Sequence, residues 1–226
     1  MTERPRRLAA LLLAALLAAA PAAAEGEANG IFALGQLDTV ATGDTLVYAH
    51  RRSGSATGPD ALPPIEGRVE VTLQPAADGG SRAAHVALVE DARTRGLPPF
   101  PATGGNPVLL VFLETGMRNM ATATGGSPFY IRNRIREALV GAGEATPVAL
   151  DLAGGTVEAR RFTVRPFADD PNRARMGAFA GLEISLVLSD EVPGGIASLE
   201  AVTGPGPDGA PALTETISFE RMEEAP

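Results

Sequence analysis

The sequence of 226 residues contains no cysteine, no lysine and only two histidines. Without cysteine it can form neither a disulfide nor a thiolate metal site, and it cannot carry the cysteine-linked lipid of a bacterial lipoprotein. All 19 basic residues are arginine, which codon usage in a GC-rich genome explains. A histidine general base or metal site would need His50 or His85, and no recognisable ligand set lies near either in sequence. We therefore expect polar strand residues at both positions, no metal site and no cofactor.

The charge balance excludes a further class of function. The formal net charge is −8, and residues 1–24 hold three arginines and one glutamate, so the chain without them carries −10. Proteins that bind nucleic acid in general need a basic surface. We therefore expect no nucleic-acid partner.

The N-terminus has the three parts of a secretory signal peptide. Arg4, Arg6 and Arg7 form a positive region, residues 8–20 are a run of 13 leucines and alanines, and residues 22–24 are alanines before Glu25. The apolar run is shorter than the roughly 20 residues that span a bilayer as a helix. We predict a signal peptide over residues 1–24 and a single soluble domain over 25–226 without a stable membrane anchor; a retained N-terminal anchor is the alternative. Export without disulfides indicates the periplasm.

Alternation of apolar and polar side chains dominates the rest of the chain. In residues 68–73, for example, Val69, Val71 and Leu73 alternate with Arg68, Glu70 and Thr72, as expected of a strand with one buried face. Turns are indicated by glycine pairs such as Gly194–Gly195. The pattern predicts strands over residues 45–50, 68–73, 82–90, 156–164, 182–188, 196–202 and 214–221.

The middle of the chain has helical spacing instead. Asn106–Pro107 and Ser127–Pro128 each place a capping residue before a proline, which is typical of a helix start. They predict helices over about 107–124 and 128–142, the first with an i,i+4 pair of Glu114 and Arg118. Residues 108–113 alone could also form a buried strand. The whole predicts an α+β fold: a curved antiparallel sheet, similar to a half-barrel, with an inserted αα-hairpin at about 107–142.

Helices across the concave side of such a sheet would either fill it or enclose an apolar pocket. Four large side chains of the two helices are candidates to line this pocket: Phe112, Met117, Met120 and Phe129. Plain core packing explains the same pattern. Both interpretations stay open at the level of sequence.

The second predicted helix is also the basic part of an acidic chain. Arg132 and Arg136 share a face with Phe129, and Ser127 lies at the positive end of the helix dipole, where backbone N–H groups can hold an anion. These residues are candidates to bind a phosphate or carboxylate, either a lipid head group or an acidic envelope protein. A solvated helix face with arginine–glutamate pairs is the alternative.

Catalytic motifs are absent from the sequence. No GxSxG nucleophile motif occurs, and residues 204–209 match GxGxxG only within a proline-rich segment that no helix can follow. We therefore name no catalytic residue and expect a non-catalytic protein. A hydrolase is the remaining enzyme hypothesis, and it requires His50 or His85 to meet a carboxylate, or each other, in a cleft.

An exported meander of strands with helices inserted over one face resembles the LolA-like half-barrels of the bacterial envelope. The stretch from Leu186 to Glu200, with its strand–turn–strand layout, is similar in style to the late part of such proteins. The resemblance implies a lipid or apolar ligand held in the concave sheet, and it transfers no functional residue. The basic helical hairpin departs from that family. Our leading hypothesis is a non-catalytic periplasmic protein that binds an apolar or lipid ligand between the sheet and the helices; a protein-interaction module using the basic helix face is the alternative.

Overall fold

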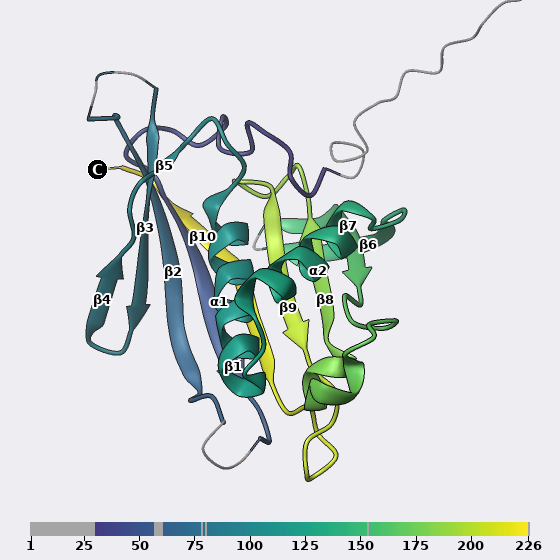
Figure 1. Ribbon diagram of the computed structural model, residues 1–226. Coiled ribbons are helices and arrows are strands. Elements are labelled where there is room, and N and C mark those ends of the chain that lie inside the picture. The colour runs from purple at the N-terminus through teal and green to yellow at the C-terminus, as the bar shows by residue number, and fades with distance from the viewer. Residues whose placement is uncertain (1–29, 57–60, 78, 80, 153, 226) are drawn as a thin grey trace, which may run out of the picture.

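The computed structural model describes residues 30–56, 61–77, 79, 81–152 and 154–225 (Figure 1). The predicted signal peptide, residues 1–24, lies outside the described residues. Ten strands form one sheet in the order β4-β3-β2-β1-β10-β9-β8-β7-β6, with the short β5 paired to β3, and every pairing is antiparallel. The strands are β1 (Thr45–Ser53), β2 (Ile65–Gln74), β3 (Ala83–Glu90), β4 (Arg93–Gly96), β5 (Phe100–Pro101), β6 (Thr146–Leu152), β7 (Gly155–Val164), β8 (Glu183–Leu188), β9 (Ile196–Val202) and β10 (Thr214–Glu223).

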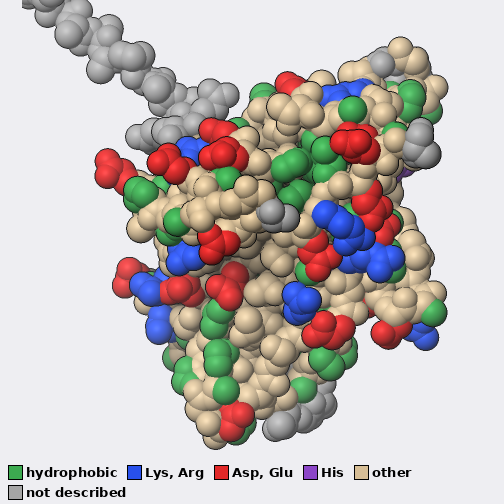
Figure 2. Space-filling view, turned by 180° about the vertical axis from the view of Figure 1, so that it is seen from behind, with side chains coloured by type: hydrophobic (Ala, Val, Ile, Leu, Met, Phe, Trp, Pro, Cys, Tyr) green, Lys and Arg blue, Asp and Glu red, His purple; other side chains and the backbone are tan. Residues whose placement is uncertain are grey.

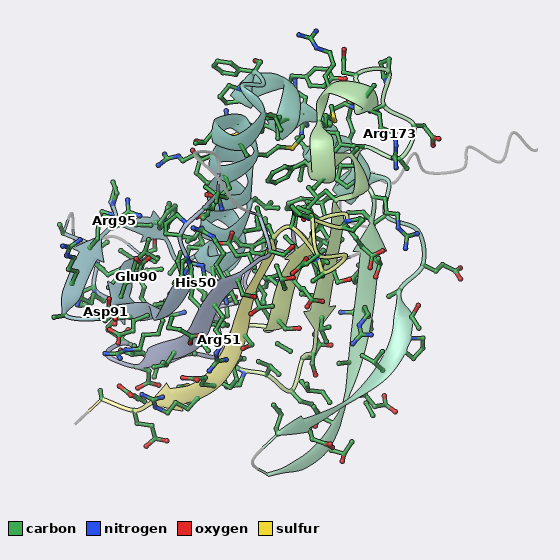
Figure 3. The ribbon with its side chains drawn as sticks, turned by 90° about the horizontal axis from the view of Figure 1, so that it is seen from below. His50, Arg51, Glu90, Asp91, Arg95 and Arg173 are labelled. Carbon is green, nitrogen blue, oxygen red and sulfur yellow. The ribbon has the colours of Figure 1, made fainter. Side chains whose placement is uncertain are left out.

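Two helices cover one face of this sheet. In Figure 1, α1 (Pro107–Thr124) and α2 (Pro128–Val140) lie in front of the strands, and in Figure 3 the sheet curves around them. Two short 3-10 helices, η1 (Arg173–Arg175) and η2 (Gly177–Gly181), precede β8. The predicted α+β fold with a curved antiparallel sheet is confirmed. The alternative of a strand over residues 108–113 is wrong, because these residues form the first turns of α1.

The start of α1 is fixed by a buried asparagine. The Asn106 side-chain oxygen accepts a hydrogen bond from the Val108 N–H at 3.1 Å, and its amide nitrogen donates to the Tyr48 hydroxyl at 2.8 Å and the Gly194 carbonyl at 2.9 Å. Gly194 has a φ of +80°, and a Cβ there would lie 2.7 Å from the Asn106 amide nitrogen, so a side chain would be strained and crowded. One residue thus caps the helix and ties it to the sheet.

The second helix begins at Pro128 as the sequence predicts, but it ends slightly earlier than expected. Ser127 precedes Pro128 as predicted, but within the described part of the chain its side chain makes no capping hydrogen bond. The helix ends at Val140 rather than near residue 142. Gly141 follows it with a φ of −85°, and its N–H donates to the Glu137 carbonyl. α1, in contrast, ends at a left-handed glycine cap, because Gly125 has a φ of +64°.

The inner face of the sheet and the undersides of the helices form the main core. Strand β1 shows the alternation: Leu46, Tyr48 and His50 face the helices, while Arg51 lies on the other side. On the face away from the helices, acidic and arginine side chains lie next to one another (Figure 2), as in the Arg68–Glu70 pair. None of the helices within the described ranges has the length and apolar character that crossing a membrane requires.

Candidate functional site

A cavity of about 460 Å³ lies between the two helices and the β3–β4 side of the sheet. Its volume is within the range of roughly 300–1,000 Å³ that is usual for small-molecule sites. Its wall is mostly apolar, and the apolar lining residues are Phe32, Leu88, Leu97, Phe100, Leu110, Val111, Leu113, Met117, Ile135 and Leu139.

The periodicity of each element explains why these side chains meet. On α2, Arg132, Ile135, Arg136 and Leu139 are spaced at i, i+3, i+4 and i+7, which places them on one face of a helix. Leu88 belongs to the inward-facing set of β3. The helix face and the strand face thus supply opposite walls of the cavity.

Charged side chains at this cavity are mostly positive. Its polar lining residues are Arg95, Glu114, Thr115, Arg118, Arg132 and Arg136. The Glu114 carboxylate lies between two of the arginines: Arg118 Nε donates to Oε1 at 3.1 Å, and Arg132 Nη2 donates to Oε2 at 3.4 Å. In the part of the chain that the structure describes, Arg95 and Arg136 are in no ion pair.

Of the residues predicted from the sequence to bind a ligand, some line the cavity and others do not. Met117, Arg132 and Arg136 line the cavity together. Phe112 is buried and lines a separate space of about 20 Å³, while Met120 is fully buried in the core. Whether any of these residues contacts a ligand stays a prediction.

The other two predicted residues point elsewhere. Phe129 is 73% exposed and is not among the residues that line the cavity. The Arg132 guanidinium lies 5.7 Å from the centre of the Phe129 ring. Ser127 is exposed at the start of α2 and is likewise not among the lining residues. The positive charge at the cavity therefore comes from arginine side chains and not from the N-terminus of α2.

The sequence interpretation missed Arg95, which reaches the cavity from β4. Residues 93–96 are all exposed and carry no apolar alternation, so no local signal predicts this strand. Figure 3 shows Arg95 at the β4 edge of the sheet. Glu114 and Arg118 were expected as a helical pair, which is confirmed, but their place at a cavity depends on how α1 packs on the sheet.

A second polar cluster is buried beneath α1. Glu215 on β10 is 1% exposed; it accepts hydrogen bonds from His50 Nε2 at 2.8 Å, from Arg52 Nη2 at 3.1 Å and from the Asn119 amide at 2.8 Å. Burial raises the pKa of the Glu215 carboxyl, but the hydrogen bonds and positive charge of His50 and Arg52 outweigh it, so the pKa lies below its ordinary value. Among the described residues, His50 Nδ1 has no hydrogen-bond partner. The cluster joins α1 to two central strands.

The two histidines lie on opposite faces of the sheet. His50 points toward the helices, whereas His85 pairs with Thr72 on β2 and faces away from them. They therefore cannot share one site. Figure 3 shows His50 and Arg51 on opposite sides of β1. Glu215 is among the residues that line a space of about 20 Å³, which is room for about one water.

Arg134, the third arginine of α2, has a structural partner. It donates to Asp170 at 2.9 Å, and this carboxylate also accepts from the Tyr130 hydroxyl at 2.7 Å and the Asn172 N–H at 2.8 Å. Burial raises the pKa of Asp170, but these hydrogen bonds outweigh it and hold the pKa below its ordinary value. Arg134 thus anchors α2, while Arg132 and Arg136 remain at the cavity.

No family model matches this chain, and no curated protein matches it in sequence. Among solved structures, the chain is similar to the lipoprotein LppX of Mycobacterium tuberculosis, with a TM-score of 0.35 and 10% sequence identity. The alignment covers 85% of this chain and 93% of LppX.

Proposed function

We propose that this protein binds an apolar or lipid ligand, without catalysis, in the cavity between α1, α2 and the sheet. The observation that supports the proposal is the cavity itself: about 460 Å³, bounded by ten apolar side chains from the N-terminal segment, the sheet and both helices. Enclosing an apolar molecule there removes apolar surface of both ligand and protein from water, at roughly 25 cal/mol per Å². The LolA-like layout of the sequence is in keeping with such a ligand.

The ligand would be bound outside the cytoplasm, because residues 1–24 have the pattern of a cleaved signal peptide. We expect the protein isolated from a bacterial host that exports it to begin at or near Glu25. Intact-mass spectrometry of the purified protein measures this directly. A mass that still includes residues 1–24 would contradict export with cleavage.

Ligand binding is tested with N-phenyl-1-naphthylamine, an uncharged apolar fluorophore that brightens when it leaves water. We expect a saturable rise in fluorescence with one probe bound per chain. Native mass spectrometry of the protein as purified, followed by lipid extraction, is expected to show a bound apolar compound. A protein that carries no lipid and shows no saturable uptake of the probe does not have the proposed function.

A further inference from the structure

Building on the ligand cavity proposed above, we infer that the ligand is an anionic amphiphile, with a carboxylate or phosphate head held by the arginines and a tail in the apolar interior. The lining includes four arginines and one glutamate, a net charge of +3, in a chain whose formal net charge is −8. These arginines come from three elements, since Arg95 is on β4, Arg118 on α1, and Arg132 and Arg136 on α2. The cavity thus gathers positive charge against the balance of the whole chain.

Some exposed arginines outside the cavity have a glutamate partner of their own, whereas the four arginines at the cavity have one carboxylate between them. Arg51, Arg68 and Arg221 each pair with a glutamate on or beside their own strand. Arg95 and Arg136 form no ion pair with any described residue, and Arg118 and Arg132 share the single carboxylate of Glu114. Guanidinium groups bind carboxylate and phosphate through paired N–H donors, so this set has unused capacity for an anion.

Glu114 occupies the position that the ligand head would take. Its two carboxylate oxygens each accept from a different arginine, one from α1 and one from α2. Both ion pairs are half-exposed and so contribute little stability, which makes them easy to exchange. An anionic head would displace Glu114 from Arg118 and Arg132, while the apolar tail extends over Met117, Ile135 and Leu139. Glu114 is thus an internal competitor of the ligand.

The test compares two competitors of equal chain length against bound N-phenyl-1-naphthylamine at pH 7.5, where a carboxylic acid is ionised. We expect dodecanoic acid to displace the probe at a concentration at least about tenfold lower than dodecan-1-ol, because a hydrogen bond to a charged group contributes more than a neutral one. Inorganic phosphate at the same concentrations is expected to leave the probe bound. Displacement by phosphate alone would indicate a site for free anions and would overturn the inference that the ligand is an amphiphile.

Variants assign the preference to particular residues. Arg132→Gln with Arg136→Gln is expected to remove the tenfold preference for the acid and to leave displacement by the alcohol within about twofold. Arg51→Gln with Arg221→Gln changes the net charge equally on exposed residues outside the cavity lining, and is expected to keep the preference. Retention of the preference in the cavity variant would overturn the assignment.

Glu114→Gln is expected to act in the opposite direction. It frees Arg118 and Arg132, so the affinity for dodecanoic acid should rise about threefold or more, while the affinity for dodecan-1-ol stays unchanged. Glu66→Gln, which removes an exposed charge elsewhere, is its control. Unchanged affinity for the acid would overturn the role of Glu114. Equal displacement by acid and alcohol in the unaltered protein would overturn the inference that the ligand has an anionic head, although the saturable probe signal would still support ligand binding in the cavity. Absence of any probe binding would instead reject the proposed function.

Discussion

Replacing Glu215 with alanine lowers the free energy of unfolding by about 3–5 kcal/mol, because it leaves buried positive charge without a partner. The Arg52 side chain is 7% exposed and the His50 side chain 3% exposed, and both bond to this carboxylate. The Asn119 amide of α1 loses its acceptor in the same change. Urea denaturation followed by circular dichroism measures the loss as a lower transition midpoint at similar slope.

Glu220→Ala is the matched control on the same strand. Glu220 forms an ion pair with Arg221 at 3.4 Å, and both side chains are at least 40% exposed, so solvent screens the interaction. We expect little change in the midpoint of this variant. Equal effects of the two substitutions would contradict the view that the buried cluster stabilises the fold.

The same cluster makes stability depend on acid pH. The pKa of Glu215 is lower in the folded protein than its ordinary 4.5, so the folded state binds fewer protons than the unfolded state as the pH falls. Its contribution is therefore fully present above pH 4.5 and is lost as the pH falls through the lower, folded-state pKa. Asp170 acts in the same direction below its ordinary 3.8. Glu215→Gln is expected to flatten the fall in stability below pH 4.5 but not to abolish it, and an unchanged slope would assign the acid sensitivity to other groups.

Local signals predict those elements whose own residues carry the pattern. β2 alternates along Val69, Val71 and Leu73 because one face of it packs on the core, and α1 begins at Pro107 because Asn106 caps it. β6 was missed although Val148, Leu150 and Leu152 alternate, with Gly155 opening the next strand. β4 carries no such signal, since all of its side chains are exposed at the edge of the sheet.

Sites formed by distant residues are beyond local patterns. His50 and Glu215 are separated by 165 positions, and only the pairing of β1 with β10 brings them together. The sequence marks α2 as basic, yet it does not separate Arg134, which bonds to Asp170, from Arg132 and Arg136, which line the cavity. That division depends on where the segment before η1 packs, which no pattern within α2 encodes.

Filling the cavity with a single large side chain should abolish ligand uptake. Leu97 is half-buried and lines the cavity from the segment between β4 and β5, where its N–H bonds to the Val86 carbonyl at 2.9 Å. A tryptophan there keeps this backbone bond and directs a bulkier ring into the space of about 460 Å³. We expect Leu97→Trp to weaken binding of N-phenyl-1-naphthylamine at least about tenfold, which corresponds to about 1.4 kcal/mol.

The chain contains no tryptophan, so the introduced ring also reports its own surroundings. We expect blue-shifted emission from Leu97→Trp, because the indole lies among apolar side chains, and water-like emission from the control Leu34→Trp. Leu34 is 72% exposed and does not line the cavity, so this control should bind the probe as the unaltered protein does. The contrary outcome is a folded Leu97→Trp variant with blue-shifted emission and unchanged uptake of the probe. In that case the ligand site lies elsewhere in the protein. Loss of uptake with blue-shifted emission would instead place the ligand among the side chains of the cavity, because only there does the new ring compete for the same space.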